Sequence, residues 1–125
     1  MLTPLPITQT HILANVKQVL GIANDDLGFD TDIITYVNFV FGILNQLGVG
    51  PEGLFSISGS SETWDLFTAN EVLLPLVKVY VVLRVRMLFD TPTNSVLNAS
   101  LTETIKEQEW RITNTMGLDL IKEEE

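Results

Sequence analysis

The stretch EVLLPLVKVYVVLRVRMLF, Glu71 to Phe89, decides the fold of this protein because it fits both a strand and a helix. Apolar side chains at every second position from Val77 to Met87 follow the pattern of a half-buried strand. A helical stripe fits as well, and comprises Val72, Leu76, Val79, Tyr80, Leu83 and Met87. The uninterrupted run is long for a strand, so we predict a helix that ends at Asp90-Thr91-Pro92.

The start of this helix has two interpretations because of Pro75. Thr68-Ala69-Asn70-Glu71 has the form of a capping box in front of an apolar run. A proline inside a helix removes a backbone hydrogen bond and clashes with the preceding turn. The helix therefore either kinks near Glu71 or begins at Pro75.

The most clearly patterned helix follows, from about Val96 to Met116, with Asn94 or Ser95 as its cap. Its apolar face comprises Leu97, Leu101, Ile105, Ile112 and Met116. Two acid–base pairs add support, Glu107 with Arg111 and Glu103 with Lys106. We expect Gly117 to end the helix. Residues 1–117 then form a single helical domain, and residues 118–125 form an acidic flexible tail.

Two further helices are predicted upstream, from about Thr10 to Leu20, where Gly21 follows as a cap, and from Asp32 to Leu47. Residues 53–67 form a loop that contains glycine and serine, with a possible short strand from Leu54 to Ser58. Four apolar side chains are expected to hold this loop on the core, namely Leu54, Ile57, Trp64 and Phe67. The fold class is therefore mainly α, a small bundle of about four helices with a long loop between the second and the third.

The segment GVGPEG, Gly48 to Gly53, matches the G-x-G-x-x-G pattern of a dinucleotide-binding turn, with Glu71 near the position of the ribose-binding acid. Such a turn needs a strand before its first glycine and a helix at its last. Here a predicted helix precedes, and LFSISGSS follows without helical periodicity. We therefore interpret the glycines as a helix end and a loop.

Charge and hydropathy narrow the classes of function. The 125 residues include 16 acids and 7 bases, a formal net charge of −9, which disfavours binding of nucleic acid through a basic face. The mean hydropathy of +0.27 is high for a soluble monomer and indicates that other subunits cover part of the apolar surface. The sequence has no cysteine, which excludes disulfides and thiolate chemistry.

No targeting or membrane segment is predicted. The N-terminal MLTPLPITQTH lacks the basic region and the apolar core of a signal peptide. Polar residues and Pro75 interrupt the apolar segments before they reach the ~20 residues that a bilayer crossing needs.

The sequence offers little for catalysis or for a metal site. His11 is the only histidine, so a transition-metal site lacks its usual ligands, and no Ser–His arrangement is recognisable. Asp30 and Asp32 could open a calcium loop, but the glycine and distal glutamate of an EF-hand are absent. We expect no cofactor, no metal and no enzymatic activity.

The basic residues are more informative, because Lys78, Arg84 and Arg86 lie on one otherwise apolar predicted helix. Arginine beside apolar surface suits pairing with a carboxylate inside the protein or across a subunit interface. The alternative is that the alkyl stems pack on the core and the charged groups reach water. For Trp110, which precedes Arg111, the sequence favours packing in the core.

The segment YVVLRVRMLFDTPTNSVLNASLTETIKEQEWRI, Tyr80 to Ile112, resembles the small head–tail connector proteins of long-tailed bacteriophages, also called head-completion or adaptor proteins. That family carries a Tyr-Val-x-Leu-(Lys/Arg)-Val-Arg-x-x-Phe-Asp-x-Pro segment, followed by a helix that ends in Ile-x-Glu-x-Glu-Trp-Arg. The matching residues are Tyr80, Val81, Leu83, Arg84, Val85, Arg86, Phe89, Asp90, Pro92, Ile105, Glu107, Glu109, Trp110 and Arg111.

The resemblance implies a structural virion protein, assembled in the cytoplasm of the host bacterium. Copies of a helical protomer, about a dozen by the resemblance, would form a ring on the phage portal protein, extend the DNA channel and present a surface to a tail-side adaptor or head-closure protein. DNA would only pass through. The candidates for oligomer or partner contacts are Lys78, Arg84, Arg86, Phe89, Asp90, Trp110 and Arg111.

Two alternatives remain from the sequence. The high mean hydropathy suits a small membrane-associated or regulatory phage protein. A nucleotide-binding protein that uses the glycine loop of residues 48–53 is less favoured, for the reason given above.

Overall fold

The computed structural model describes the backbone of residues 5–124 and the side chains of residues 5–117. Within that part the fold is entirely helical, without a sheet, as the sequence predicts. The six helices are α1 (Ile7–Thr10), α2 (Ile12–Leu20), α3 (Asp30–Gln46), α4 (Trp64–Phe67), α5 (Leu73–Phe89) and α6 (Ser95–Glu124). None of them is both long and apolar enough to cross a bilayer, as far as the described residues extend.

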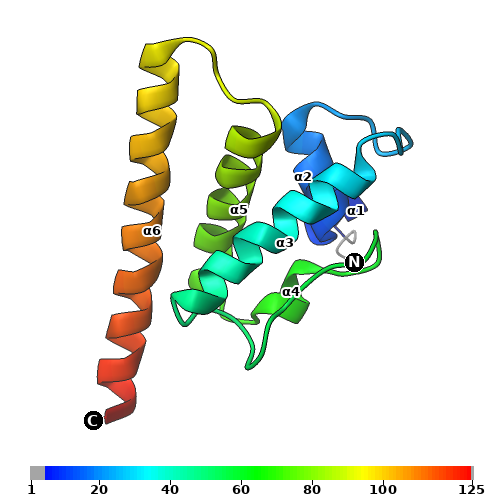
Figure 1. Cartoon of the computed structure of the whole chain (residues 1–125). Helices are drawn as coiled ribbons and strands as arrows, with labels where there is room; N and C mark the ends of the chain where they lie inside the picture. Colours follow the sequence, from blue (N-terminus) through cyan, green and yellow to red (C-terminus); the bar gives the residue numbers. More distant parts are fainter. Residues whose placement is uncertain (1–4, 125) are drawn as a thin grey trace.

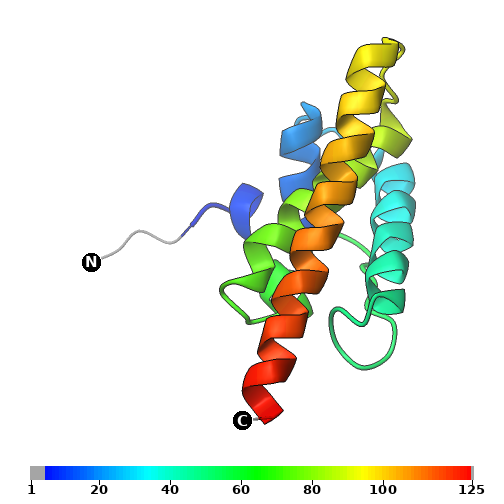
Figure 2. The ribbon, with the colours of Figure 1, turned by 90° about the vertical axis from the view of Figure 1, so that its left-hand side faces the viewer.

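Helix α5 is the centre of the bundle. It packs against α2, α3, α4 and α6. Figure 1 shows α6 on one side of α5, α2 on the other and α3 crossing in front. The view in Figure 2, turned by 90°, shows α6 running along the length of the bundle. Among the described residues, no helix packs over the side of α5 that carries Val79 and Arg86, although α2 flanks it.

The helical interpretation of Glu71–Phe89 is confirmed. The buried residues of α5 follow helical spacing and comprise Leu73, Val77, Tyr80, Val81 and Val85. Val79, which a strand would place on the same face as Val77 and Val81, is 47% exposed. The predicted helical stripe is wrong in phase, because Val72 and Val79 are exposed and Tyr80 is its one buried member. The helix begins at Leu73, so Pro75 lies in its first turn and causes no break in the regular part.

The cap of α5 differs from the predicted capping box. The Asn70 side chain accepts hydrogen bonds from the backbone N–H groups of Val72 (2.9 Å) and Leu73 (3.0 Å). Thr68 Oγ1 instead accepts a hydrogen bond from Asn70 N (3.2 Å). The side chains of Asn70 and Thr68 therefore determine where α5 begins.

Helix α6 lies beside α5 and is capped by Asn94, whose Oδ1 accepts hydrogen bonds from Val96 N (2.9 Å) and Leu97 N (3.2 Å). The side chains that face the bundle are Leu101, Ile105, Gln108, Ile112 and Met116. Leu97 is exposed, so its predicted place on this face is wrong. The predicted end at Gly117 is also wrong, because α6 continues to Glu124. Flexibility of the acidic segment 118–125 stays a prediction, since its side chains lie outside the described residues.

The N-terminal helix is divided. His11 is extended (φ −94°, ψ 133°) between α1 and α2, where a single helix from Thr10 was predicted. The reason is a contact with the distant loop: Ile12 N donates a hydrogen bond to Glu62 O (3.0 Å), and His11 forms an isolated bridge with Thr63. The predicted end of α2 at Gly21, with φ +80°, is confirmed.

The glycine loop ends α3, as predicted. Gly48 has φ +81°, and its N–H donates to Asn45 O (3.0 Å), while Val49 N donates to Leu44 O (2.9 Å). These two bonds form a Schellman motif, which satisfies carbonyl groups at a helix C-terminus. The loop therefore follows a helix and not a strand, so the structural context of a dinucleotide-binding turn is missing.

The loop of residues 53–67 contains no strand in the described structure, so the short strand considered at Leu54–Ser58 is not formed. Asn38 of α3 takes the place of a neighbouring strand: its side chain accepts a hydrogen bond from Ile57 N (2.7 Å) and donates one to Ile57 O (2.9 Å). Ile57, Trp64 and Phe67 are buried as predicted, whereas Leu54 is exposed. Phe55 packs in its place against Phe41, with ring centres 5.0 Å apart.

Glu62 fixes the end of this loop. Its carboxylate accepts hydrogen bonds from Ser58 N (2.6 Å) and Ser58 Oγ (3.1 Å). Burial acts to raise the pKa of Glu62, but hydrogen bonds from the Ser58 and Gly59 region outweigh it and lower the pKa below the usual value.

Lys17 was not singled out from the sequence, yet it is buried and anchors the acidic segment between α2 and α3. Its Nζ donates to Asn24 O (3.0 Å) and Asp26 O (2.7 Å) and lies 2.8 Å from the Asp30 carboxylate. The Lys17 ammonium group thus supplies the positive charge that the two carbonyl groups and the carboxylate of this segment face. The described residues hold no group of three or more His, Asp or Glu that could bind a metal ion.

Replacement of Gly50 should destabilise the protein. Gly50 has φ +105°, and an added Cβ would lie 2.5 Å from Cε2 of the buried Phe67 ring. We expect Gly50→Ala to lower the free energy of unfolding by about 2–4 kcal/mol, from backbone strain and overpacking together. Gly53→Ala is the matched control, because Gly53 also has positive φ (+79°) but open space around it. It should cost about 1 kcal/mol. If urea unfolding shows equal losses of unfolding free energy in Gly50→Ala and Gly53→Ala, the role of the Phe67 contact is contradicted.

Replacement of Lys17 should also destabilise the protein. Lys17→Met leaves the Asp30 carboxylate and two carbonyl groups without their partner. Breaking a fully buried pair costs about 3–5 kcal/mol. Because the Asp30 side chain keeps 24% exposure, we expect the lower part of that range or slightly less, ~2–3 kcal/mol. Lys106→Met, at an exposed pair, should change stability by less than ~0.5 kcal/mol. An unchanged free energy of unfolding in Lys17→Met would show that the Lys17 contacts do not stabilise the fold.

Candidate functional site

The predicted contact residues do not form one cluster. They lie in four places on the protomer: at the Trp64 side of α5, between α5 and α6, at the turn that joins these helices, and on the outside of α6. Each place has its own geometry, and the places differ in how much apolar surface they leave exposed.

Lys78 is held within its own chain. Its Nζ donates a hydrogen bond to Gln9 O (3.1 Å) and lies 5.9 Å from the centre of the Trp64 ring. These contacts tie the N-terminal segment to α5. The residue also borders the exposed groove described below.

Arg84 forms a half-buried network between α5 and α6. Arg84 Nε donates to Tyr80 Oη (2.8 Å), and Tyr80 Oη donates to Glu109 Oε2 (2.9 Å). Arg84 Nη2 lies 3.4 Å from the same carboxylate oxygen. The predicted pairing of an arginine with a carboxylate is thus seen within the chain for Arg84, and a contact of Arg84 with another subunit stays a prediction.

Burial and the network change the acidity of the Tyr80 phenol. Burial raises the pKa of Tyr80 to about 12, and the hydrogen bond to Glu109 acts in the same direction. The nearby Arg84 cation opposes the shift only in part. Because its pKa is raised to about 12, Tyr80 is protonated at neutral pH and donates its hydrogen bond to Glu109.

The side of α5 without a helical neighbour is apolar. We define the α5 open face as Val19 of α2 together with Val79, Val82, Leu83 and Arg86 of α5. Val19 is 45% and Val79 47% exposed. A groove of about 280 Å³ runs between the two helices and is lined by Asn15, Val19, Lys78, Val79, Val82 and Leu83. Apolar surface of this kind is typical of contact with another protein.

Arg86 lies on the same side of α5, seven positions after Val79. It is exposed, and it forms no hydrogen bond through its side chain and no ion pair with the residues whose side chains are described. With Asp90 and Leu97 it lines a pocket of about 290 Å³ at the turn between α5 and α6. Phe89 points elsewhere and packs edge-on against Phe29, with ring centres 5.4 Å apart.

Trp110 lies on the outside of α6 and is 64% exposed, so the predicted core position is wrong. Gln108 and Ile112 occupy the side that faces the bundle, and two residues along a helix correspond to a rotation of about 200°. We define the α6 outer face as Val96, Glu103, Lys106, Glu107 and Trp110. Val96 is 74% exposed. Arg111 pairs with Glu107 (2.8 Å) and Lys106 with Glu103 (3.6 Å), as predicted.

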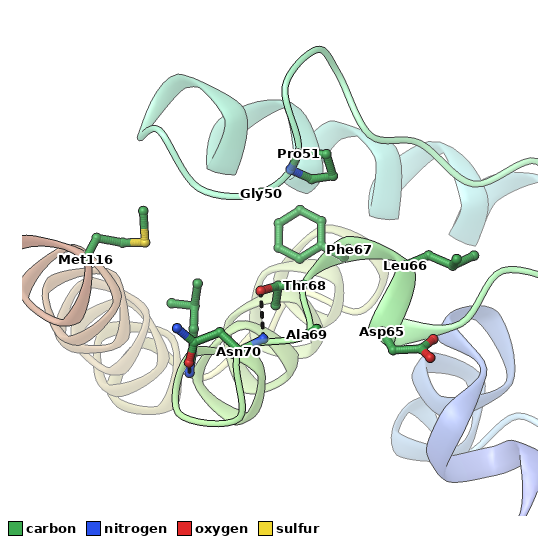
Figure 3. Close-up of a pocket in the computed structure, with 10 residues that line it drawn as sticks. Gly50, Pro51, Asp65, Leu66, Phe67, Thr68, Ala69, Asn70 and Met116 are labelled. Atoms are coloured by element: carbon green, nitrogen blue, oxygen red, sulfur yellow. Dashed lines mark hydrogen bonds between the residues drawn. The ribbon is translucent and has the colours of Figure 1, made fainter. Parts of the chain in front are cut away.

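The pocket beside the glycine loop does not suit a nucleotide. It measures about 500 Å³ and is lined by Gly50, Pro51, Asp65, Leu66, Phe67, Thr68, Ala69, Asn70, Leu73 and Met116. Figure 3 shows the Phe67 ring below Gly50 and the Asp65 carboxylate at one edge. These lining residues include an acid and no base, which is unfavourable for a phosphate group.

Titration of Tyr80 tests the network between α5 and α6. In a Tyr36→Phe variant, Tyr80 is the one remaining tyrosine, and tyrosinate absorbance should rise with a midpoint near pH 12. The protonated phenol stabilises the fold, so this contribution is complete below pH 10 and is lost as pH rises towards 12. Tyr80→Phe should remove this component from the pH dependence of stability. A midpoint near 10 would contradict both the burial of the Tyr80 phenol and its hydrogen bond to Glu109.

Comparison with known families agrees with the resemblance noted above. The model described as "Phage connector protein" matches residues 12–118, which is most of the chain. Comparisons with curated proteins and with solved structures returned no match. The chain therefore belongs to the phage connector protein family, a structural and non-enzymatic class of virion component.

Proposed function

We propose that this connector protein forms a ring at the head–tail junction, docks on the portal, extends the DNA channel and provides the attachment surface for a tail-side protein. Family membership supports the role in the virion. The observation that carries the ring is the exposure of large apolar side chains on two different faces, Val79 with Val19 and Trp110 with Val96. Identical subunits in a ring meet head to tail, so each needs two different complementary surfaces.

The net charge of the chain favours a role in which DNA moves past the protein, and disfavours one in which the protein binds DNA. The formal net charge is −9, and most bases among the described side chains already contact acids or carbonyl groups. A protein that holds DNA neutralises phosphates with free Lys and Arg. A ring with an acidic surplus repels the phosphate backbone instead, which suits a wall past which DNA moves.

The test is assembly with the portal protein of the same phage. Electron microscopy of the purified mixture should show a closed ring, of about a dozen copies, coaxial with the portal. Mass measurement should give one fixed number of copies for each portal. Fluorescence anisotropy at 150 mM salt should show no tight binding of duplex DNA to the chain alone.

A monomer in solution without the portal does not count against the proposal, because the portal can template the ring. Absence of binding to the portal at micromolar concentrations would overturn it. Sedimentation of the chain with phospholipid vesicles would instead favour the membrane-associated alternative.

A further inference from the structure

We infer that neighbouring copies in the ring meet through the α6 outer face of one copy and the α5 open face of the next, with Trp110 on Val79 and Glu103 on Arg86. This inference rests on the proposed ring and names the surfaces that close it. The occupant of the α5 open face is thus a second copy of the same chain.

The two faces match in spacing. Val79 and Arg86 lie seven positions apart on α5, and Glu103 and Trp110 lie seven positions apart on α6. Seven residues are close to two helical turns, so the members of each pair point the same way, about 10.5 Å apart along the helix. When the two helices run antiparallel, Trp110 reaches the groove at Val79 while Glu103 reaches Arg86.

The two faces also match in chemistry. The groove beside Val79 is lined mostly by apolar side chains, and an exposed tryptophan is the side chain that most often dominates a protein interface. Arg86 has no carboxylate partner among the described side chains and lies next to apolar surface, where arginine pairs well with an acid.

Glu103 is the acid that can exchange its partner most easily. Its pair with Lys106 spans 3.6 Å, and both side chains are at least 70% exposed, so it contributes little. Glu107 is held more closely by Arg111, at 2.8 Å. Glu103 is also the acid whose separation from Trp110 equals that between Val79 and Arg86.

A copy cannot make this contact with itself. Helix α6 packs on α5 through Ile105, Gln108 and Ile112, which leaves Trp110 on the far side of α6. The α5 open face lies on a different side of α5 from the one that α6 covers. The contact must therefore run from one copy to the next, and repetition of it gives a ring or a filament.

Cysteine cross-linking tests the contact directly, because the natural sequence has no cysteine. A chain that carries both Arg86→Cys and Glu103→Cys, and keeps Val79 and Trp110, should form a ladder of covalent oligomers with a short bis-maleimide cross-linker in the presence of portal. The matched control pairs Glu103→Cys with Phe39→Cys, since Phe39 is an exposed aromatic residue on α3. The control should stay monomeric on a denaturing gel.

Charge exchange tests the second pair. Arg86→Glu or Glu103→Arg alone should reduce the fraction of chain in portal-bound rings roughly tenfold, and the double variant should recover to within about threefold of the natural chain. Trp110→Ala should abolish rings, whereas Phe39→Ala should not. All these side chains are exposed, so circular dichroism and thermal unfolding should stay unchanged.

The outcomes separate the two proposals. Rings of Trp110→Ala with normal copy number, or an Arg86→Cys/Glu103→Cys chain that forms rings but no ladder, would overturn this inference and leave the proposed function intact. A natural chain that binds no portal would overturn the proposed function first. Loss of portal binding in Trp110→Ala without a ladder in the double-cysteine chain would assign Trp110 to the portal and refute the contact between copies.

Discussion

The packing of α5 against four other helices is the constraint on which the rest of the structure depends. Val77, Tyr80, Val81 and Val85 face inward at helical spacing and lose all contact with water. Three sides of the helix are covered by α2, α3 and α6 (Figure 1). Within the described part of the chain no helix packs over the fourth side, so the valines and the leucine that lie there stay partly in water. The protomer thus gains a stable core and keeps an apolar strip that it cannot bury by itself.

Polar side chains hold the connections around this core. Lys17 binds the carbonyl groups of the segment between α2 and α3, and Asn38 binds both backbone groups of Ile57. Asn70 and Asn94 cap α5 and α6. Each of these groups satisfies backbone atoms that no helix or sheet would satisfy. Single side chains therefore hold the loops in place, which explains how the long loop keeps a defined position although the described residues form no sheet.

Sequence reasoning succeeded where a pattern is long and local. The run from Glu71 to Phe89 favours a helix by its length alone, and Gly48 marks the end of α3 by its chemistry. It failed where tertiary contacts decide. His11 leaves the helix because Ile12 bonds to Glu62. Trp110 fits an apolar core by residue type, but its helical phase, two positions from both Gln108 and Ile112, directs it outward. Lys17 gave no signal, because a lone lysine on an amphipathic helix normally reaches water.

Arg86 differs from the other described basic residues because its side chain has no acidic or carbonyl partner. The chain has nine more acids than bases. Among the described side chains, ion pairs with acids are formed by Lys17, Arg84, Lys106 and Arg111, and Lys78 donates a hydrogen bond to a backbone carbonyl. Arg86 makes neither kind of contact. Arg86 lines the pocket at the turn between α5 and α6 together with Asp90, yet the two side chains form no ion pair. Copies with a like net charge repel one another, so contact needs apolar area and a local attraction. The α5 open face offers both the apolar area and the local positive charge, because Arg86 lies on the same side of α5 as Val79.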